Sequence, residues 1–166
     1  MFSRLGNLFS FFDYPSFKRI KSPFEGNVLP LSLIKNSVIS KNIIGPSVAV
    51  LPTSDTVRAP CNAVVKAISE KNNALVLVVG KVELIINAGL NPKKYPDMLF
   101  DVKVRKGDAV TAGMPLLSFN LESISQYDPS FSCVLTVRQV KSLRCYSFTS
   151  DKKVFFDTVL FRLNTE

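Results

Sequence analysis

The stretch EKNNALVLVVGKVELIINAGL, residues 70–90, decides the fold that we expect for this chain. Within it, residues 74–79 and 82–86 are short apolar runs rich in Val and Ile, which is typical of buried strands. The Gly80-Lys81 step between the two runs has the composition of a tight hairpin turn. The sequence therefore predicts an antiparallel hairpin within a strand-rich protein.

The hairpin would also bring two asparagines together at one end of the strand pair. Asn73 precedes the first run and Asn87 ends the second, so antiparallel pairing places them close to each other. Asparagine is a common turn former at strand ends, and this is the simplest interpretation of each residue taken alone. The surrounding sequence supports a second interpretation, in which the pair marks a functional site.

Motifs that flank the hairpin occur in one order and register over roughly residues 20–163. They are Asn72-Asn73-Ala74 with residues 82–90 (VELIINAGL), and residues 22–26 (SPFEG), 43–53 (IIGPSVAVLPT), 59–60 (AP), 104–108 (VRKGD) and 116–121 (LLSFNL). Together they resemble the glucose-type (type 1) enzyme IIA domain of the bacterial phosphoenolpyruvate-dependent sugar phosphotransferase system. The resemblance implies an all-β fold, a compact barrel or sandwich built from a duplicated hybrid motif, with short helices.

The resemblance also shows which chemistry this chain has lost. In the resembling family, histidines stand at the positions of Asn73 and Asn87; one accepts a phosphoryl group and the other hydrogen-bonds the phosphate. An amide offers no nucleophilic nitrogen lone pair, and the whole chain contains no histidine. We therefore expect a phosphotransferase-system protein with a disabled phosphorylation site, which acts as a regulatory or protein-binding module without a cofactor. Two alternatives stay open: phosphoryl transfer by an atypical route, and a membrane-surface adaptor.

The expected binding face surrounds the two asparagines. By register with the family, it comprises Val38, Ile39, Lys41, Lys71, Asn72, Ile85, Ala88, Lys93 and Lys94. In the resembling family this face is an apolar patch with an acidic fringe that receives the phosphocarrier protein and the sugar permease. Here Asn36, Lys41, Asn91 and Lys94 stand at the usually acidic positions. A basic rim would repel the usual basic phosphocarrier, so the expected protein partner is acidic.

Composition limits the other function classes. The 166 residues are 46% hydrophobic, which suits one domain with a sizeable core. The three cysteines are odd in number and widely spaced, so we expect neither disulfides nor a zinc site. The formal charge of +8 lies largely in lysine- and arginine-rich turns, but no recognition helix or stacking-aromatic motif points to nucleic acid. Without a signal peptide or a membrane-spanning run, the expected location is cytoplasmic.

Residues 1–19 form an expected tail ahead of an enzyme IIA-like domain at 20–166. Phe2, Leu5, Phe9 and Phe12 follow near-helical spacing, beside several basic residues. Such an amphipathic helix would contact anionic lipid weakly, which would place the protein peripherally at the inner membrane face. The alternative is a helix that folds back and covers an apolar edge of the sheet.

Four further elements are predicted from local patterns. Residues 121–127 are expected to form a helix that begins after Asn120, and residues 91–97 a surface loop. Residues 131–137 and 154–163 are the expected closing strands.

Overall fold

A computed structural model describes residues 17–138, 145–147 and 151–164 of the chain. The predicted amphipathic helix falls within residues 1–16 and lies outside the described residues. Within the described ranges, no helix is both long and apolar enough to cross a membrane.

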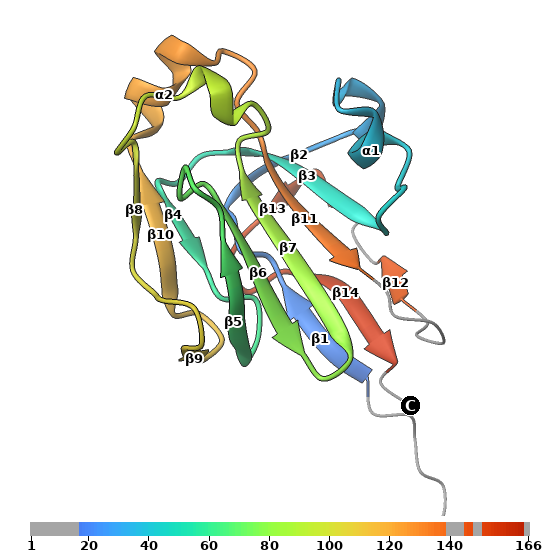
Figure 1. Cartoon of the computed structure of the whole chain (residues 1–166). Coiled ribbons are helices and arrows are strands. Elements are labelled where there is room, and N and C mark those ends of the chain that lie inside the picture. The colour runs from blue at the N-terminus through green and yellow to red at the C-terminus, as the bar shows by residue number, and fades with distance from the viewer. Residues whose placement is uncertain (1–16, 139–144, 148–150, 165–166) are drawn as a thin grey trace, which may run out of the picture.

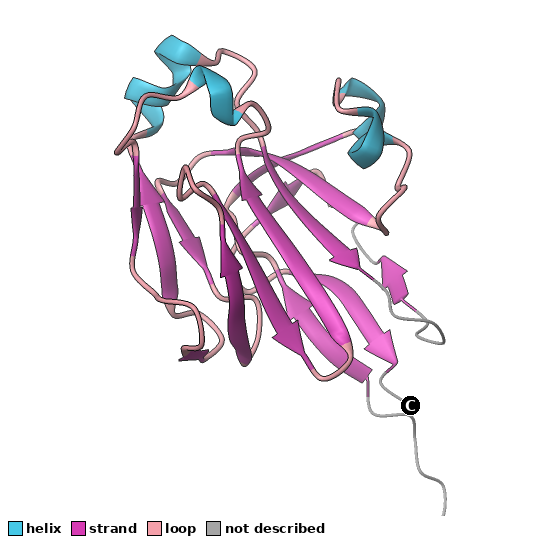
Figure 2. Cartoon of the chain, viewed as in Figure 1, coloured by secondary structure: helices cyan, strands magenta, loops and turns pink. Residues whose placement is uncertain are grey.

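Strands dominate the structure, and the helical segments are short (Figure 2). The strands are β1 (Phe17–Lys21), β2 (Gly26–Leu29), β3 (Ser47–Pro52), β4 (Thr56–Arg58), β5 (Ala63–Ile68), β6 (Ala74–Val79), β7 (Val82–Ala88), β8 (Phe100–Val102), β9 (Ala109–Val110), β10 (Pro115–Phe119), β11 (Cys133–Arg138), β12 (Cys145–Ser147), β13 (Lys153–Val154) and β14 (Val159–Asn164). The helical segments are the 3-10 helices η2 (Leu31–Leu33) and η3 (Pro92–Lys94) and the α-helices α1 (Ser37–Ser40) and α2 (Leu121–Tyr127).

Three sheets share one core (Figure 1). The largest has the strand order β13-β2-β3-β11-β7-β6-β5-β9, and the two smaller sheets are β4-β10-β8 and β1-β14-β12. All strand pairs that the structure describes are antiparallel. This sandwich-like, mostly β architecture confirms the predicted fold class.

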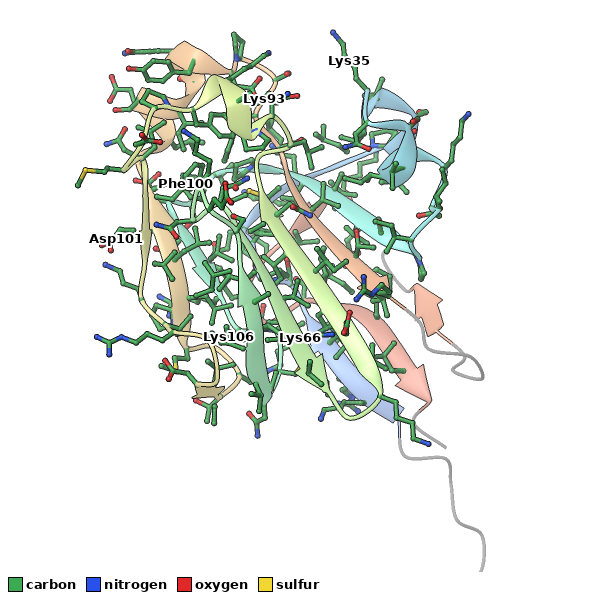
Figure 3. All side chains as sticks on the ribbon, viewed as in Figure 1. Lys35, Lys66, Lys93, Phe100, Asp101 and Lys106 are labelled. Atoms are coloured by element: carbon green, nitrogen blue, oxygen red, sulfur yellow. The ribbon has the colours of Figure 1, made fainter. Side chains whose placement is uncertain are left out.

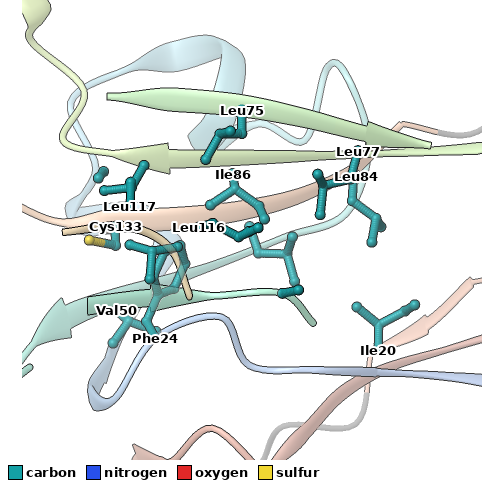
Figure 4. Close-up of a cluster of buried hydrophobic side chains, with 14 of the residues drawn as sticks. Ile20, Phe24, Val50, Leu75, Leu77, Leu84, Ile86, Leu116, Leu117 and Cys133 are labelled. Carbon is teal, nitrogen blue, oxygen red and sulfur yellow. The ribbon is translucent and has the colours of Figure 1, made fainter. Parts of the chain in front are cut away.

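The β6–β7 hairpin has the predicted turn and register. Val79 pairs with Val82 across Gly80 and Lys81, and Ala74 pairs with Asn87 at the open end. Alternate residues of both strands are fully buried, as one core-facing side requires. Figure 4 shows these side chains with their neighbours in the core, among them Leu75, Leu77, Leu84, Ile86, Leu116 and Leu117.

Helical segments gather at the end of the molecule where β7 ends (Figures 1 and 2). The side chain of Asn36 accepts hydrogen bonds from the backbone N–H groups of Val38 and Ile39 and so caps α1. A second apolar cluster, which includes Ile39 and Val134, packs the segment of residues 31–39 onto the outer face of the large sheet, opposite the core. The segment covers β3 and β11 but leaves Ile85 of β7 half-exposed.

Several local predictions are confirmed and others need correction. The helix at 121–127 begins after Asn120 as expected, because the Asn120 side chain accepts a hydrogen bond from the N–H of Ser123. The expected strand 154–163 is wrong as a single element, since it divides into β13 and β14 in different sheets. A turn separates them, in which the Thr158 N–H donates to the Phe155 carbonyl. The loop 91–97 contains η3, and the pairing of β1 with β14 begins at Phe17.

An ion-pair group on the outer sheet face makes stability depend on pH. Glu83 of β7 pairs with Lys66 of β5 and with Arg138 of β11 (Lys66 in Figure 3). The hydrogen bond from Lys66, with the nearby Arg138 guanidinium, outweighs burial and holds the pKa of Glu83 below its ordinary value of 4.5. A lowered folded-state pKa stabilises the fold above that ordinary value and stops doing so as pH falls through the folded-state pKa.

We therefore expect the urea midpoint of the protein to fall on acidification below about pH 4.5 more steeply than that of Glu83→Gln. The measurement is urea unfolding at a series of pH values. Identical slopes in the two proteins would contradict a role for this carboxylate.

Candidate functional site

A shallow hollow opens on the outer face of the large sheet, beside the start of β6 and the end of β7. Its volume is about 430 Å³. Ala74, Ile85 and Asn87 contribute from the hairpin, and Thr136 from the neighbouring strand β11. The remaining lining residues come from two other segments and from the turn before β6, and they are Asn36, Val38, Ile39, Ile44, Ser69, Asn73, Gly89, Leu90 and Pro92. We call this the apolar hollow.

Asn73 is a buried hydrogen-bonding residue in this hollow, with 4% of its surface exposed. Its Nδ2 donates to the carbonyl oxygens of Ala88 and Gly89, at 3.3 and 3.2 Å. Its Oδ1 accepts from the Ser69 hydroxyl at 3.0 Å. The amide therefore uses both donors and one acceptor to fasten the turn before β6 to the end of β7.

Asn87 differs from Asn73 in exposure and in its contacts. It is half-buried, lies opposite Ala74 in β6 and Val134 in β11, and lines the same hollow. Within the part of the chain that the structure describes, its side chain makes no hydrogen bond. The hairpin thus brings both asparagines to one hollow, as the sequence predicts.

The chemistry of the apolar hollow is that of amides, hydroxyls and hydrocarbon. Among the described residues, its lining holds no carboxylate, thiol, imidazole or amine. Two hydroxyls opposite each other, those of Ser47 and Thr136, hydrogen-bond to one another at 2.8 Å. The described residues likewise contain no group of three potential metal ligands. The hollow can therefore accept an apolar surface and exchange hydrogen bonds, but it offers no general base.

A buried tyrosine, Tyr95, lies against Gly89, which lines the hollow. The hydroxyl of Tyr95 donates to Asp128 Oδ2 at 2.9 Å, and both residues are almost fully buried. Burial raises the pKa of Asp128, but hydrogen bonds from Ser130, Tyr95 and Asn91 and the charge of Lys94 together lower it below its ordinary range. Burial and the hydrogen bond to Asp128 raise the pKa of Tyr95. Tyr95 therefore stays a neutral hydrogen-bond donor.

Several lysines lie near the site, and only some of them have an acidic partner. Lys71 pairs with Asp97, and the Nζ of Lys94 lies 3.8 Å from Asp128 Oδ1. Lys35, Lys41 and Lys93 are exposed and form no ion pair with any described residue. Lys35 extends outward at the end of the molecule that carries the helical segments, and Lys93 lies at the same end (Figure 3).

The residues predicted to bind are divided among several surfaces. Val38, Ile39 and Ile85 line the apolar hollow, whereas Lys71 and Asn72 line a separate one with Asp97 and Met98. Lys93 and Lys94 line a hollow next to Leu90, and Lys41 ends α1.

One predicted position turns inward. Ala88 is fully buried in the core, so it offers the site only the carbonyl that Asn73 binds. Ile44, Leu90 and Thr136 also line the hollow, and they are not among the residues predicted to bind. The position of Thr136 in the hollow could have been predicted from strand pairing, because Thr136 lies directly opposite Ile85.

The profile of the family described as phosphoenolpyruvate-dependent sugar phosphotransferase system, EIIA 1, matches residues 18–143. The chain belongs to this family. The match contains the whole apolar hollow and both asparagines. The predicted family is therefore confirmed, and the chain is of the EIIA type.

Similar proteins include two longer curated relatives. The glucose-specific EIIBCA component of Corynebacterium glutamicum is 36% identical over 106 residues, which are 63% of this chain and 16% of that protein. The beta-glucoside-specific EIIBCA component of Bacillus subtilis is 32% identical over 138 residues, which are 81% of this chain and 22% of that protein. The EIIA-type chain therefore spans less than a quarter of the length of each of these relatives.

A solved structure shows the same fold. The glucose permease IIA of Mycoplasma capricolum matches with a TM-score of 0.75 and 18% identity, over 90% of this chain and 96% of that one. The agreement covers nearly all of both chains, so the sandwich of the EIIA-type chain is the fold of that protein.

Two cysteines, Cys61 and Cys133, lie in the interior of the EIIA-type chain. Cys61 and Cys133 are free and buried. Burial raises the pKa of Cys61 to about 11, although the charge of Lys18 acts in the opposite direction, and burial also raises the pKa of Cys133. Both thiols are therefore protonated near neutral pH and are poor nucleophiles.

Proposed function

We propose that this chain is an EIIA-type protein whose phosphorylation site is disabled and which acts by binding a protein partner. One observation carries the proposal: Asn73 and Asn87 meet at the hollow, and its described lining contains no group that can accept a phosphoryl group as a histidine would. The absence of histidine from the whole chain supports it.

The bonding of Asn73 supports a structural role in place of a chemical one. Both amide hydrogens are held by backbone carbonyls, so the side chain already acts as a fixed connection between two segments. An amide in this position stabilises the shape of the hollow without changing its charge. Val38 and Ile44 expose apolar groups on this face, and exposed apolar surface of this kind is suited to association with another protein.

A cytoplasmic location goes with this proposal, because the partners of EIIA-type proteins in the resembling family act there. Contact of the tail with anionic membrane is a separate part of the proposal, and it rests on the sequence pattern of residues 2–12 alone.

Phosphoryl transfer tests the proposal directly. Incubated with labelled phosphoenolpyruvate and a complete phosphotransfer chain, the protein is expected to take up no acid-labile phosphate, because neither asparagine has a nucleophilic nitrogen. An ordinary EIIA domain in the same mixture serves as the positive control. Stable labelling of the unmodified protein at any residue of the apolar hollow would overturn the proposal and favour transfer by an atypical route.

A further inference from the structure

Another hollow, distinct from those described above, adjoins the apolar hollow and is lined by more polar and charged residues. It has a volume of about 320 Å³ and lies between residues 33–36 and residues 90–94. We call it the polar hollow. Asn36 and Leu90 line both hollows, so the two hollows lie next to each other. A ligand that occupies one can therefore place its next group in the other.

The polar hollow carries excess positive charge at its rim. Lys35 contributes from the segment before α1, and Lys94 contributes from η3. Asp128 also lines the hollow, but it is 1% exposed and its oxygens accept hydrogen bonds from Ser130 and Tyr95. The buried carboxylate is therefore satisfied within the protein, while both ammonium groups remain accessible to a partner.

A second copy of the chain does not suit this surface. A two-fold contact through the polar hollow would bring the lysines of one copy against the same lysines of the other. The formal charge of +8 adds repulsion between whole molecules. Both the local and the overall charge therefore favour a partner of opposite sign.

We infer that the two hollows together bind an acidic protein segment, with an apolar side chain in the apolar hollow and a neighbouring carboxylate in the polar hollow. The carboxylate lies between Lys35 and Lys94, where Lys94 exchanges part of its interaction with Asp128 for the incoming charge. The apolar side chain packs on Val38, Ile39 and Ile85. The inference rests on the proposed function, because it assigns the partner of the same face.

Burial and charge have separate roles in this recognition. Removing the apolar side chain from water supplies most of the affinity, in proportion to the apolar area that is buried. The lysines mainly select the sign of the partner and accelerate its association, an effect that salt weakens. Binding should therefore weaken with added salt without disappearing.

The test uses the full chain, labelled with nitrogen-15, and two synthetic peptides of equal length with the same apolar residues. One peptide carries Asp and Glu beside the apolar residues, and the other carries Lys at those positions. Only the acidic peptide is expected to shift the amide signals of Ile39, Ile85 and Leu90. In Lys35→Glu/Lys94→Gln, its affinity should fall by about tenfold, and that of the basic peptide should rise.

Lys106→Glu/Lys81→Gln is the matched control, because it changes the net charge by the same amount at two exposed turn residues. Lys106 lies at the opposite end of the molecule from Lys35 (Figure 3). The control should change the affinity by less than about twofold. The inference would be overturned if both peptides bound equally or if neither bound. It would also be overturned if the protein formed a dimer that became stronger in the charge variants. These outcomes are independent of the phosphate measurement, which tests the disabled site whatever the peptides do.

Discussion

Gly89→Ala is expected to destabilise the protein by about 3 to 5 kcal/mol, a large share of the stability of a single domain. Gly89 has a φ of +83°, which is unfavourable for any residue with a Cβ. A Cβ there would lie 2.7 Å from a ring carbon of Phe131 and 2.7 Å from Tyr95 Cζ, and still nearer to the Tyr95 oxygen. Tyr95 cannot move aside easily, because it is buried and hydrogen-bonded to Asp128.

Gly113→Ala is the matched control for this prediction. Gly113 has almost the same φ, +85°, but no atom lies within 4 Å of the Cβ position. It should therefore show the backbone strain alone, about 1 to 2 kcal/mol. The difference between the two variants in thermal or urea unfolding measures the overlap with Tyr95 and Phe131. If both variants lose the same stability, the packing of Tyr95 under the site is not rigid.

The fold was largely predictable from the sequence because its central hairpin has a strong local signal. Apolar runs of the right length flank Gly80, and the resulting register places Asn87 opposite Ala74. The division between β13 and β14 was not predictable, because Phe155 and Val159 look alike in a hydrophobic pattern and only the turn between them separates two sheets.

The site was predictable in part for a similar reason. The sequence pattern located both asparagines and half-exposed Ile85, which lie on or next to one regular hairpin. It did not indicate that Lys71 pairs with Asp97, since that contact depends on how two separate loops meet. Alternation along β7 could have shown that Ala88 points into the core, opposite to Asn87, but not that its carbonyl accepts a hydrogen bond from Asn73. Side-chain direction follows from register, whereas loop contacts follow from tertiary packing.

Asn73→Asp is expected to lower the free energy of unfolding near neutral pH by about 3 to 5 kcal/mol. The substitution keeps the size of the side chain but replaces an amide donor with a carboxylate. The charge would then face the carbonyl oxygens of Ala88 and Gly89, which have lost their hydrogen bonds, in a position that is 4% exposed. Urea unfolding of the variant and of the unmodified protein measures the loss.

The loss should depend on pH in a direction that identifies its cause. Burial and the two carbonyls favour the protonated form of the introduced carboxyl, because only that form can donate a hydrogen bond, so its folded-state pKa is raised above the ordinary value of about 3.9. The folded variant then binds the proton more tightly than the unfolded chain. Its destabilisation is therefore smallest below about pH 3.9 and grows as pH rises through the raised pKa.

Asn87→Asp is the control for this prediction, since the half-buried Asn87 makes no side-chain hydrogen bond within the described residues. It should cost about 1 kcal/mol or less, with little dependence on pH, because no buried carbonyl loses a donor and water still reaches the new charge. Equal losses in the two variants would show that Asn73 does not hold the hairpin end to the turn before β6.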